Sequence, residues 1–471
     1  METVMNNNYN MNYGRRKQNA PHRSPNKKSR FPFGMLFISM LAITAVFAVI
    51  WAAALRNSSP SAKPSDAVGT VQNSEDGTLP TDSGNVVDPN GYTEMTLLST
   101  GDLMYHSPQI EAAYNSADGT YDFSQTFKYI REVVADADYS VINFETTLAG
   151  SEYEYSGWPT FNSPDEGFEA VLDAGFDMML FANNHCYDKK LPGVLRTIKM
   201  FENAGVDYVG AKANTSDKTY KNVTVNGITL GILNSTDDLS YGATGTRTVN
   251  GITLDSGDLD HLDVFNLSLL DQFYAETAKR IKSLRDGGAE LIVYYIHWGN
   301  EYSLEHNETQ AAMAKKLCDL GVDVIIGGHP HVVQDAEIIT SSTDPSHKTL
   351  CFYSLGNFVS NQNRLTLGDT ANKEYTENGL MVKLTVRKYN SGECLVTNVE
   401  TIPLWVHRYR DTAKMNYIVI PLESALADPS AFGLYDSSFG ITNAKSALQM
   451  TNATLGGICE AFAGAVSLPV K

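Results

Sequence analysis

The sequence VDVIIGGHPHVV, at residues 322–333, carries the clearest indication of strand structure and of a ligand site in this chain. It begins with a short, mostly apolar run rich in β-branched residues, which predicts a strand buried on both faces. Gly327 and Gly328 then predict an end to the strand and a sharp turn of the backbone. His329 and His331 follow on the predicted loop, with a proline that restricts the backbone between them.

Two imidazoles at the carboxyl end of a buried strand stand where open α/β sheets bind their ligands. Neutral imidazole is also a common protein ligand of zinc-like metals. A plain turn can carry the same H-x-H pair, so the metal interpretation depends on what the other predicted strands carry at their ends.

Five further apolar runs predict strands that also end in polar side chains. The runs are residues 95–100, 139–144, 176–182, 291–296 and 349–355. At or just past their ends stand Asp102, Asn143, Glu145, Asn184, His185, His297 and Asn357. Because parallel strands bring their carboxyl ends to one edge of a sheet, we expect these side chains to lie together. Oxygen and imidazole ligands without thiolate suit manganese, zinc or iron, as one ion or as a pair that could generate hydroxide at neutral pH.

Apolar runs alternate with helical patterns from residue 92 onward, which predicts an α/β fold. The expected segments are a basic cytoplasmic tail at 1–34, a transmembrane anchor at 35–55, a flexible linker at 56–91, a globular domain at 92–410, and a C-terminal extension packed on or following that domain at 411–471. The extension carries a helical pattern at 444–463, to which we assign no chemistry.

The run MLFISMLAITAVFAVIWAAAL, residues 35–55, has no charge and is long enough to span a bilayer as one helix. Its apolar core and its basic leader are both longer than in a secretory signal, which favours a retained anchor, although the alanines at 52–54 could form a cleavage site. Positive charge before the helix predicts a cytoplasmic N-terminus and an extracellular main domain at the cell membrane.

Charge is distributed unevenly along the 471 residues, whose formal total is −18. Residues 1–56 hold eight Lys or Arg and one Glu, a charge of +7, so the remainder carries −25. This acidic body disfavours nucleic acid as a partner, because nucleic-acid binding depends on phosphate neutralisation by Lys and Arg.

The five cysteines show no C-x-x-C spacing, which disfavours a structural zinc site or a thioredoxin-like redox motif. Their odd number leaves at least one thiol unpaired within a monomer. Cys186 lies next to His185, but no base is assigned to it, and we expect a buried, inert thiol.

Six motifs in order resemble those of the CapA family of capsule biosynthesis proteins. They are GDLMYH, NFETTL, ANNHCYD, HWGNEY, GGHPHVVQ and SLGNF, and the resemblance covers about residues 95–406. It implies poly-gamma-glutamate as the polymer. The family in turn resembles calcineurin-like metallophosphoesterases, which implies that residues 92–410 form a four-layer α/β/β/α sandwich of metallophosphoesterase type, preceded here by the one transmembrane helix.

The phosphoesterase resemblance also implies metal ligands, residue by residue. Asp102 and His331 match ligands of a first metal, whereas His297 and His329 match ligands of a second. Glu145 stands where the phosphoesterases carry an aspartate that bridges the two metals.

Two further matches and one departure complete this implied site. Asn184 matches an amide ligand of the second metal, and His185 matches the catalytic group that protonates the leaving group. Met104 stands where the first phosphoesterase motif, D-x-H, has its histidine. The first metal site is therefore short of a ligand, and a single or weakly bound metal is a further possibility; His106, two residues on, is not counted as its replacement.

Five residues are candidate substrate contacts: Asn143, Trp298, Glu301, Tyr302 and Asn357. Trp298 and Tyr302 could form an aromatic wall for substrate, or could cover the strand end as core. Glu301 could bind an amine or orient His297, and Asn357 could hydrogen-bond the site or belong to a plain Gly-Asn turn.

Two functions are consistent with these features. The first is a metal-dependent hydrolase or transferase that acts on a phosphoester or an amide during synthesis, export or attachment of an anionic capsule polymer. The second is a non-catalytic subunit that holds the polymer near the subunits of a membrane synthase. In both cases an acidic body should repel a polyanion at long range, so divalent cations or a local basic patch must offset that repulsion.

Overall fold

The computed structural model describes residues 91–470, with gaps at 239–245, 412–413, 436–438 and 465–467. The expected basic tail, the apolar run at 35–55 and all but the last residue of the linker lie outside the described residues. Within the described ranges, no helix is both long enough and apolar enough to cross a bilayer.

Two large β-sheets form the centre of the described chain. Sheet 1 has nine strands, of which seven follow the order β19 (Met415–Pro421), β18 (Cys394–Arg410), β17 (Asn378–Tyr389), β1 (Tyr92–Leu103), β4 (Tyr139–Phe144), β5 (Met178–Leu180) and β6 (Asp207–Val209). In the same sheet, β16 (Asn357–Val359) pairs with β1, and β20 (Leu468–Val470) pairs with β18.

Sheet 2 has seven strands. Six follow the order β11 (Val264–Phe265), β8 (Ile228–Asp237), β12 (Leu291–His297), β13 (Val324–Gly328), β15 (Lys348–Phe352) and β14 (Ala336–Thr340), and β7 (Lys221–Val225) pairs with β8. Two short ribbons lie outside these sheets: β2 (Tyr114–Asn115) with β3 (Thr120–Tyr121), and β9 (Thr248–Val249) with β10 (Ile252–Thr253).

The strands that carry the predicted site are parallel within each sheet. In sheet 1, β1, β4 and β5 are parallel neighbours, and in sheet 2, β8, β12, β13 and β15 are parallel neighbours. The strand pattern alone predicts one sheet edge, whereas the phosphoesterase resemblance implies two packed sheets, and the structure brings the carboxyl-end edges of two sheets together. Alternating side chains explain this arrangement, because a strand buried on both faces can pack on a second sheet as well as on helices.

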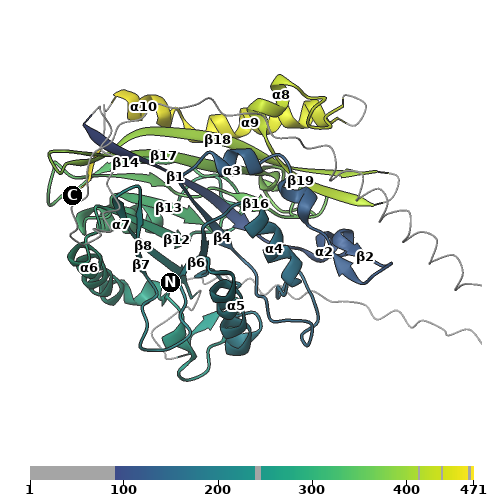
Figure 1. The fold of residues 1–471 in the computed structure, drawn as a ribbon, viewed down its shortest axis with the longest axis horizontal. Helices are drawn as coiled ribbons and strands as arrows, with labels where there is room; N and C mark the ends of the chain where they lie inside the picture. Colours follow the sequence, from purple (N-terminus) through teal and green to yellow (C-terminus); the bar gives the residue numbers. More distant parts are fainter. Residues whose placement is uncertain (1–90, 239–245, 412–413, 436–438, 465–467, 471) are drawn as a thin grey trace, which may run out of the picture. The chain divides into compact units, whose positions relative to one another are not determined.

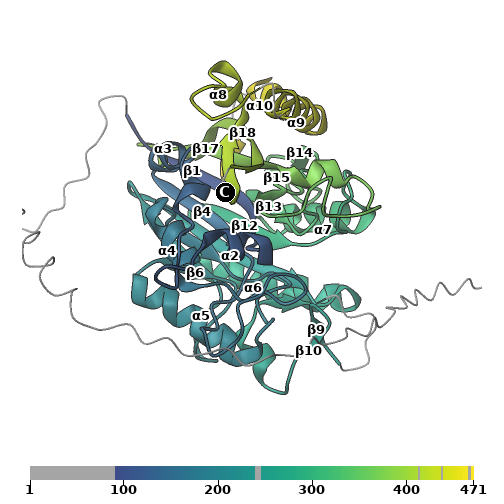
Figure 2. The same cartoon turned by 90° about the vertical axis from the view of Figure 1, so that its right-hand side faces the viewer.

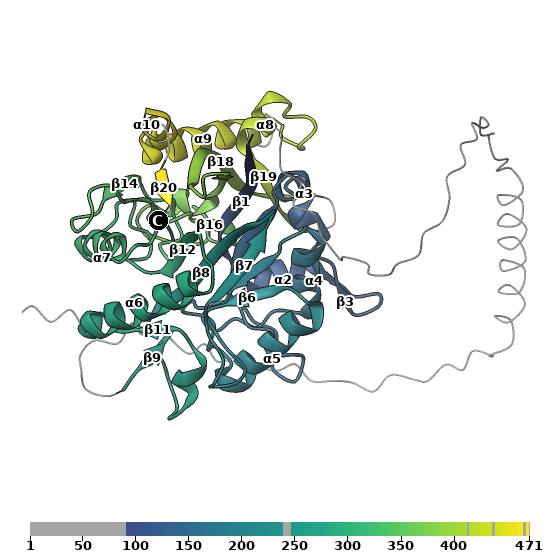
Figure 3. The same cartoon turned by 60° about the vertical axis from the view of Figure 1, so that its left-hand side comes forward.

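Apolar side chains fill the space between the sheets and cover both outer faces. Leu97 of sheet 1 and Val293 of sheet 2 belong to the core between the sheets. The outer face of sheet 1 packs against α4 (Asp165–Asp173) and α5 (Lys190–Ala204) through residues that include Phe168 and Phe201. The outer face of sheet 2 packs against α6 (Leu270–Asp286) and α7 (Glu308–Asp319), and Figure 3 shows these two helix pairs on opposite sides. The expected α/β class is confirmed.

Local sequence explains where the covering helices run. Val194, Ile198 and Phe201 recur at helical spacing and form the buried stripe of α5, which ends at Gly205 in the left-handed region. The N-terminus of α7 is closed by a capping box, in which the Asn307 side chain accepts a hydrogen bond from the backbone three residues on.

The C-terminal part of the chain completes sheet 1 and adds a helical layer. Here α8 (Leu422–Ala427), α9 (Gly440–Leu455) and α10 (Ile458–Gly464) lie over β18 (Figures 1 and 2). Trp405 and Ile420 anchor this layer in a separate apolar cluster. The helical pattern expected at 444–463 is two helices, because Gly456 and Gly457 both adopt positive φ angles.

The opening stretch differs from the sequence expectation at its glycines. Strand β13 continues through Gly327 and Gly328 instead of ending before them. An added Cβ at Gly327 would lie 1.9 Å from the Tyr353 carbonyl oxygen, so the absence of a side chain permits close approach of two backbones. The turn itself lies at His329 and His331, which have φ angles of 95° and 57°. Such conformations are strained for non-glycine residues, and strain of this kind persists mainly at functional sites.

Candidate metal centre

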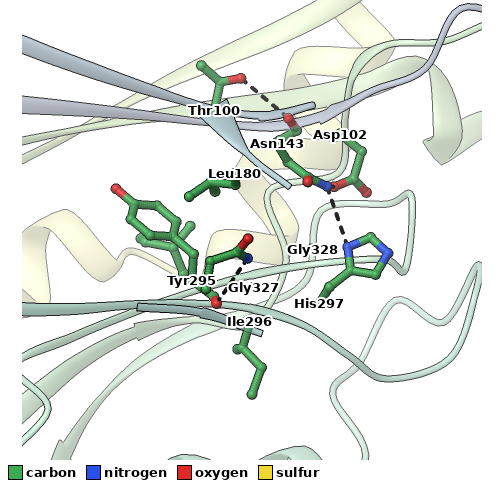
Figure 4. Close-up of a pocket in the computed structure, with 12 residues that line it drawn as sticks. Thr100, Asp102, Asn143, Leu180, Tyr295, Ile296, His297, Gly327 and Gly328 are labelled. Atoms are coloured by element: carbon green, nitrogen blue, oxygen red, sulfur yellow. Dashed lines mark hydrogen bonds between the residues drawn. The ribbon is translucent and has the colours of Figure 1, made fainter. Parts of the chain in front are cut away.

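Strand ends from both sheets converge on one buried site. Asp102 comes from the end of β1, Glu145 follows β4, and His297 ends β12. His329 and His331 follow β13. Figure 4 shows Asp102 and His297 on either side of the Asn143 amide, with the backbone of Gly328 beside them.

Asp102 is a fully buried carboxylate held by three donors. Its Oδ1 accepts a hydrogen bond from Asn143 Nδ2 at 2.7 Å, and its Oδ2 accepts one from the His329 backbone amide at 3.1 Å. His331 Nδ1 also lies 3.1 Å from Oδ2. Burial raises the pKa of Asp102, but the hydrogen bond and charge of His331 outweigh burial and lower the pKa to about 2. Asp102 is therefore ionised at neutral pH.

Glu145 is the second buried carboxylate and is incompletely satisfied. Its Oε2 accepts from Asn143 Nδ2 at 3.3 Å, whereas its Oε1 is buried without a hydrogen-bond partner. Burial and the nearby charge of Asp102 raise the pKa of Glu145 to about 8. A buried oxygen without a donor is costly, so this atom marks a place where a cation or a proton belongs.

His297 and His329 are neutral imidazoles. His297 Nε2 lies 2.7 Å from Asn184 Oδ1, 3.2 Å from His329 Nδ1 and 3.5 Å from Glu145 Oε1. Burial lowers the pKa of both histidines to about 3. A neutral ring keeps a nitrogen lone pair for a metal, which is the form that metal binding requires.

His331 joins the two carboxylates. Its Nδ1 contacts Asp102, and its Nε2 lies 3.9 Å from Glu145 Oε1. Although burial lowers its pKa, the charges of Glu145 and Asp102 raise the pKa of His331 to about 9. In the absence of metal, His331 is therefore protonated at neutral pH and supplies positive charge at the place where a cation would sit.

The residues present fit a divalent ion. Ligand atoms of Asp102, Glu145 and His297 all lie within 4.8 Å of one another, and all three residues are buried. These atoms are carboxylate oxygens and an imidazole nitrogen, a set that suits manganese, zinc or iron. The unsatisfied Oε1 of Glu145 faces this space, close to both His297 and His331.

His185 lies in a separate dyad with Asp188, a residue that the sequence reasoning missed. His185 Nδ1 is 2.7 Å from Asp188 Oδ2. Asp188 also accepts hydrogen bonds from the Phe161 amide and from the Asn250 side chain. Burial lowers the pKa of His185, but the charge and hydrogen bond of Asp188 act in the opposite direction, and the pKa is raised overall. The available signal was an aspartate three residues after the histidine in NHCYD, where a backbone turn before α5 brings the two side chains together.

Three of the five candidate substrate contacts are buried and have structural partners. Asn143 supports the ligands, since its amide contacts both carboxylates. Trp298 is buried, stacks on Tyr353 and donates to the Tyr353 carbonyl oxygen, so it belongs to the core. Asn357 is buried beside Asp102 in the paired strand and donates to Gln362 and Thr376.

Tyr302 and Glu301 lie nearer to the protein surface than the other three candidate substrate contacts. The Tyr302 ring centroid is 6.3 Å from that of His331, and its hydroxyl accepts a hydrogen bond from Gln362. Glu301 is exposed and lines a groove of about 570 Å³ whose wall includes His329. This groove therefore reaches the edge of the buried centre at His329.

Met104 and His106, the positions of the incomplete first motif, are not ligands in this arrangement. Met104 is buried in the apolar core. His106 packs edge-on against Phe161 and accepts a hydrogen bond from the Asn361 amide at 3.3 Å. Among the described residues, no hydrogen bond or ion pair connects His106 to either carboxylate.

All five cysteines are free thiols. Cys186 is fully buried, and burial raises its pKa to about 12. The thiol is therefore protonated at neutral pH and is a poor nucleophile, as expected from the sequence.

Comparison with known proteins identifies the family. The family model described as "Bacterial capsule synthesis protein PGA_cap" matches residues 96–362, which include every strand end of the site. The chain belongs to this capsule synthesis family. Members of the family share the matched region, so the buried centre lies in the part that defines the PGA_cap family.

Two curated relatives support the same assignment. The chain is 31% identical over 291 residues to "Capsule biosynthesis protein CapA" of Bacillus anthracis, which covers 60% of this chain and 64% of the relative. It is 28% identical over 278 residues to "PGA biosynthesis protein CapA" of Bacillus subtilis (strain 168), which covers 58% of this chain and 64% of the relative. A solved structure, a hypothetical protein from Thermus thermophilus, aligns with a TM-score of 0.37 and 12% identity over 66% of this chain and 98% of that chain, and adds nothing to the assignment.

Proposed function

We propose that this family member is anchored in the cell membrane and faces the outside. There it acts in the synthesis, export or attachment of a capsule polymer, with poly-gamma-glutamate as the polymer. The uncharged run at 35–55 and its basic leader support the anchor. The relative in Bacillus subtilis is named a PGA biosynthesis protein, which supports the choice of polymer.

We further propose that the buried centre is a metal-dependent hydrolase or transferase site with the metallophosphoesterase type of architecture. The observation that carries this proposal is Glu145 Oε1, a buried oxygen without a donor that lies 3.5 Å from His297 Nε2. A bound divalent ion would supply a polarised substrate oxygen and a hydroxide nucleophile at neutral pH.

The side chains of this protein would contribute the remaining chemistry. Asp102, Glu145 and His297 would hold the ion, with His329 and His331 on either side of them. His185 would donate a proton to the leaving nitrogen or oxygen, because Asp188 holds its ring by Nδ1 and leaves Nε2 for the substrate.

The experiment is a metal and turnover measurement on the full-length protein. Elemental analysis should find about one or two divalent ions per chain. Two activities should be followed: shortening of poly-gamma-glutamate chains, and release of the leaving group from a phosphodiester substrate. Each is measured before chelation, after chelation and after addition of manganese, zinc or iron. Turnover of either substrate that is lost on chelation and restored by metal supports the proposal. A protein that binds no metal and turns over neither substrate would overturn it.

The alternative is a non-catalytic subunit that holds the polymer beside membrane synthase subunits. The buried Met104, in place of the histidine of D-x-H, favours this alternative because it leaves the first metal position with fewer ligands. The same experiment separates the two functions. Bound metal and polymer binding without any turnover would support the accessory role.

A further inference from the structure

A second pocket, of about 290 Å³, lies at the open edge of β18. It exists because β17 begins at Asn378, opposite Trp405, so that β18 from Val406 onward has no strand on this side among the described residues. The loop at 360–365 and the N-terminal end of α9 close the gap only partly. The pocket lining includes Arg364, Arg408, Arg410, Trp405, His407 and Tyr409.

Two of the three arginines are not neutralised. Arg364 forms a two-pronged ion pair with Glu377, with bonds of 2.8 and 3.1 Å. Neither Arg408 nor Arg410 has a carboxylate partner in the part of the chain that the structure describes. Arg408 Nε is also buried without a hydrogen-bond partner. Glu377 is the only acidic side chain that the described residues contribute to the lining, so this pocket is cationic in an acidic protein.

Aromatic rings line the same strand. The centroid of the His407 ring is 4.9 Å from that of Trp405 and 4.9 Å from that of Tyr409, so the three rings form a continuous stack. Burial lowers the pKa of His407 to about 4, and its Nδ1 has no hydrogen-bond partner among the described residues. At the rim, Leu365 is 78% exposed. Trp405 and His407 are only 4% and 5% exposed, so the apolar surface of the pocket comes from Leu365 and the half-buried Tyr409. Side chains alternate along β18, so the stacked rings and the two unpaired arginines project to opposite faces of the strand.

The loop that closes the pocket also contacts residues beside the candidate metal centre, although no hydrogen bond among the described residues joins it to a proposed ligand. Gln362 donates to the Tyr302 hydroxyl at 3.1 Å and accepts from Asn357 at 3.0 Å. One residue earlier, the Asn361 amide donates to His106. Gln362 itself lines the pocket, so a single short segment borders both places.

We propose that this pocket is a subsite that holds carboxylate groups of the capsule polymer, beside the centre where the polymer is processed. The choice of polymer rests on the proposed function. Guanidinium groups match carboxylates in geometry as well as charge, and the exposed Leu365 and half-buried Tyr409 suit the methylene groups between successive carboxylates of a gamma-linked chain. The pocket also supplies the local basic patch that an outer part with a charge of −25 needs to bind a polyanion.

The test measures binding of a gamma-linked glutamate pentamer to full-length protein by isothermal titration calorimetry, in chelator and about 0.15 M salt. The double variant Arg408→Gln/Arg410→Gln removes the two unpaired cations and keeps polar side chains. We expect it to weaken binding by roughly 10-fold or more, because hydrogen bonds to charged groups are among the stronger ones. Lys315→Gln, a loss of one exposed charge on α7, is the control and should leave binding unchanged.

The outcomes distinguish this inference from the proposed function. Equal affinity of the double variant and the wild type would overturn the subsite, whatever the turnover measurement gives. Tighter binding of a glycerol phosphate oligomer than of the glutamate pentamer would also overturn it, since that result assigns the pocket to a phosphate polymer. If the protein binds the pentamer through these arginines but shows no turnover, the subsite proposal stands and the hydrolase proposal is rejected. Circular dichroism of each variant checks that loss of binding is not loss of folding.

Discussion

The backbone amide of His329 donates a hydrogen bond of 3.1 Å to Oδ2 of Asp102, and so joins two residues that lie 227 positions apart. This bond ties the end of β13 in sheet 2 to the end of β1 in sheet 1. His331 holds the same oxygen with its ring. The loop after β13 therefore contributes a main-chain donor as well as two imidazoles, and its left-handed residues keep these groups aimed at the carboxylates.

The first prediction concerns the ligands. His329→Ala removes an imidazole without leaving a buried charge, so the fold should survive. Metal affinity should fall by at least the roughly 10- to 100-fold that loss of a supporting partner usually costs. Competition with a chromophoric chelator measures the affinity. His261→Ala is the control, because His261 lies in a short 3₁₀ segment and its ring bonds only the Lys212 carbonyl oxygen among the described residues. An unchanged affinity in His329→Ala would exclude His329 from the metal centre.

Backbone strain at His329 gives the second prediction. Its φ of 95° is a conformation that glycine adopts freely and alanine does not. His329→Gly should therefore be more stable than His329→Ala by about 1 kcal/mol, the scale of the left-handed penalty. Urea unfolding of both variants measures the difference in free energy of unfolding. The matched pair at Lys315, in the middle of α7, should show the opposite order, because glycine is the weaker helix former. The same order at both positions would mean that His329 is not strained.

The two glycines of GGHPH should respond differently to alanine. A Cβ at Gly328 would lie 2.7 Å from Asp102 Oδ1 and 3.4 Å from His297 Nδ1, so Gly328→Ala should displace ligands and weaken metal binding. A Cβ at Gly327 would meet the Tyr353 backbone, so Gly327→Ala should lower the free energy of unfolding by about 1–3 kcal/mol. Metal affinity and urea unfolding measured on both variants give the answer. Equal effects of the two substitutions on metal affinity would contradict this assignment.

Metal affinity should rise with pH between about 6 and 8. Burial and the charge of Asp102 raise the pKa of Glu145, and the charges of Glu145 and Asp102 raise the pKa of His331, so this pair holds a proton at neutral pH in the metal-free protein. An ion binds the deprotonated forms, and protons must leave as it enters. As pH rises toward these pKa values the competition weakens and affinity increases. Calorimetry in buffers of different ionisation enthalpy should record proton release at neutral pH. Proton uptake, or affinity that falls as pH rises, would rule this out.

Asp188→Asn tests the role of His185 in turnover. Asp188 raises the pKa of His185, so its replacement should lower that pKa. A general acid works only while protonated, and its rate falls as pH rises through its pKa. The alkaline limb of the pH–rate profile should therefore move to lower pH, with metal content unchanged. A variant that loses rate equally at every pH would assign Asp188 a purely structural role.

Membrane topology can be checked on intact cells. External protease should digest the protein beyond residue 56 and spare residues 1–30, because positive charge before an apolar helix keeps the N-terminus in the cytoplasm. Antibodies against each end of the chain, with and without permeabilisation, report which part is cut. Protection of the C-terminal domain in intact cells would reverse the assigned orientation.

Strand ends and the chemical type of their side chains could be predicted from the sequence because both are local properties. The β-branched run before GGHPH, and similar runs before Asp102, Glu145 and His297, are each visible within a few residues. The rule that parallel strands expose ligands at their carboxyl ends then placed these groups together. The departure at Met104 was equally visible, since it is a single position in a short motif.

Features that depend on strand pairing, or on the close approach of segments distant in sequence, became visible only in the tertiary structure. Sequence periodicity does not say whether parallel strands share a sheet, so the strand pattern alone did not predict that Asp102 and His329 come from different sheets, although the phosphoesterase resemblance implied a sandwich of two sheets. The left-handed turn at His329 follows two glycines whose backbones pass close to Tyr353 and Asp102, and neither feature is visible in the local sequence pattern. The arginine pocket exists only because β17 begins opposite Trp405, and a hydrogen-bond register of this kind is set by the packing of the whole sheet.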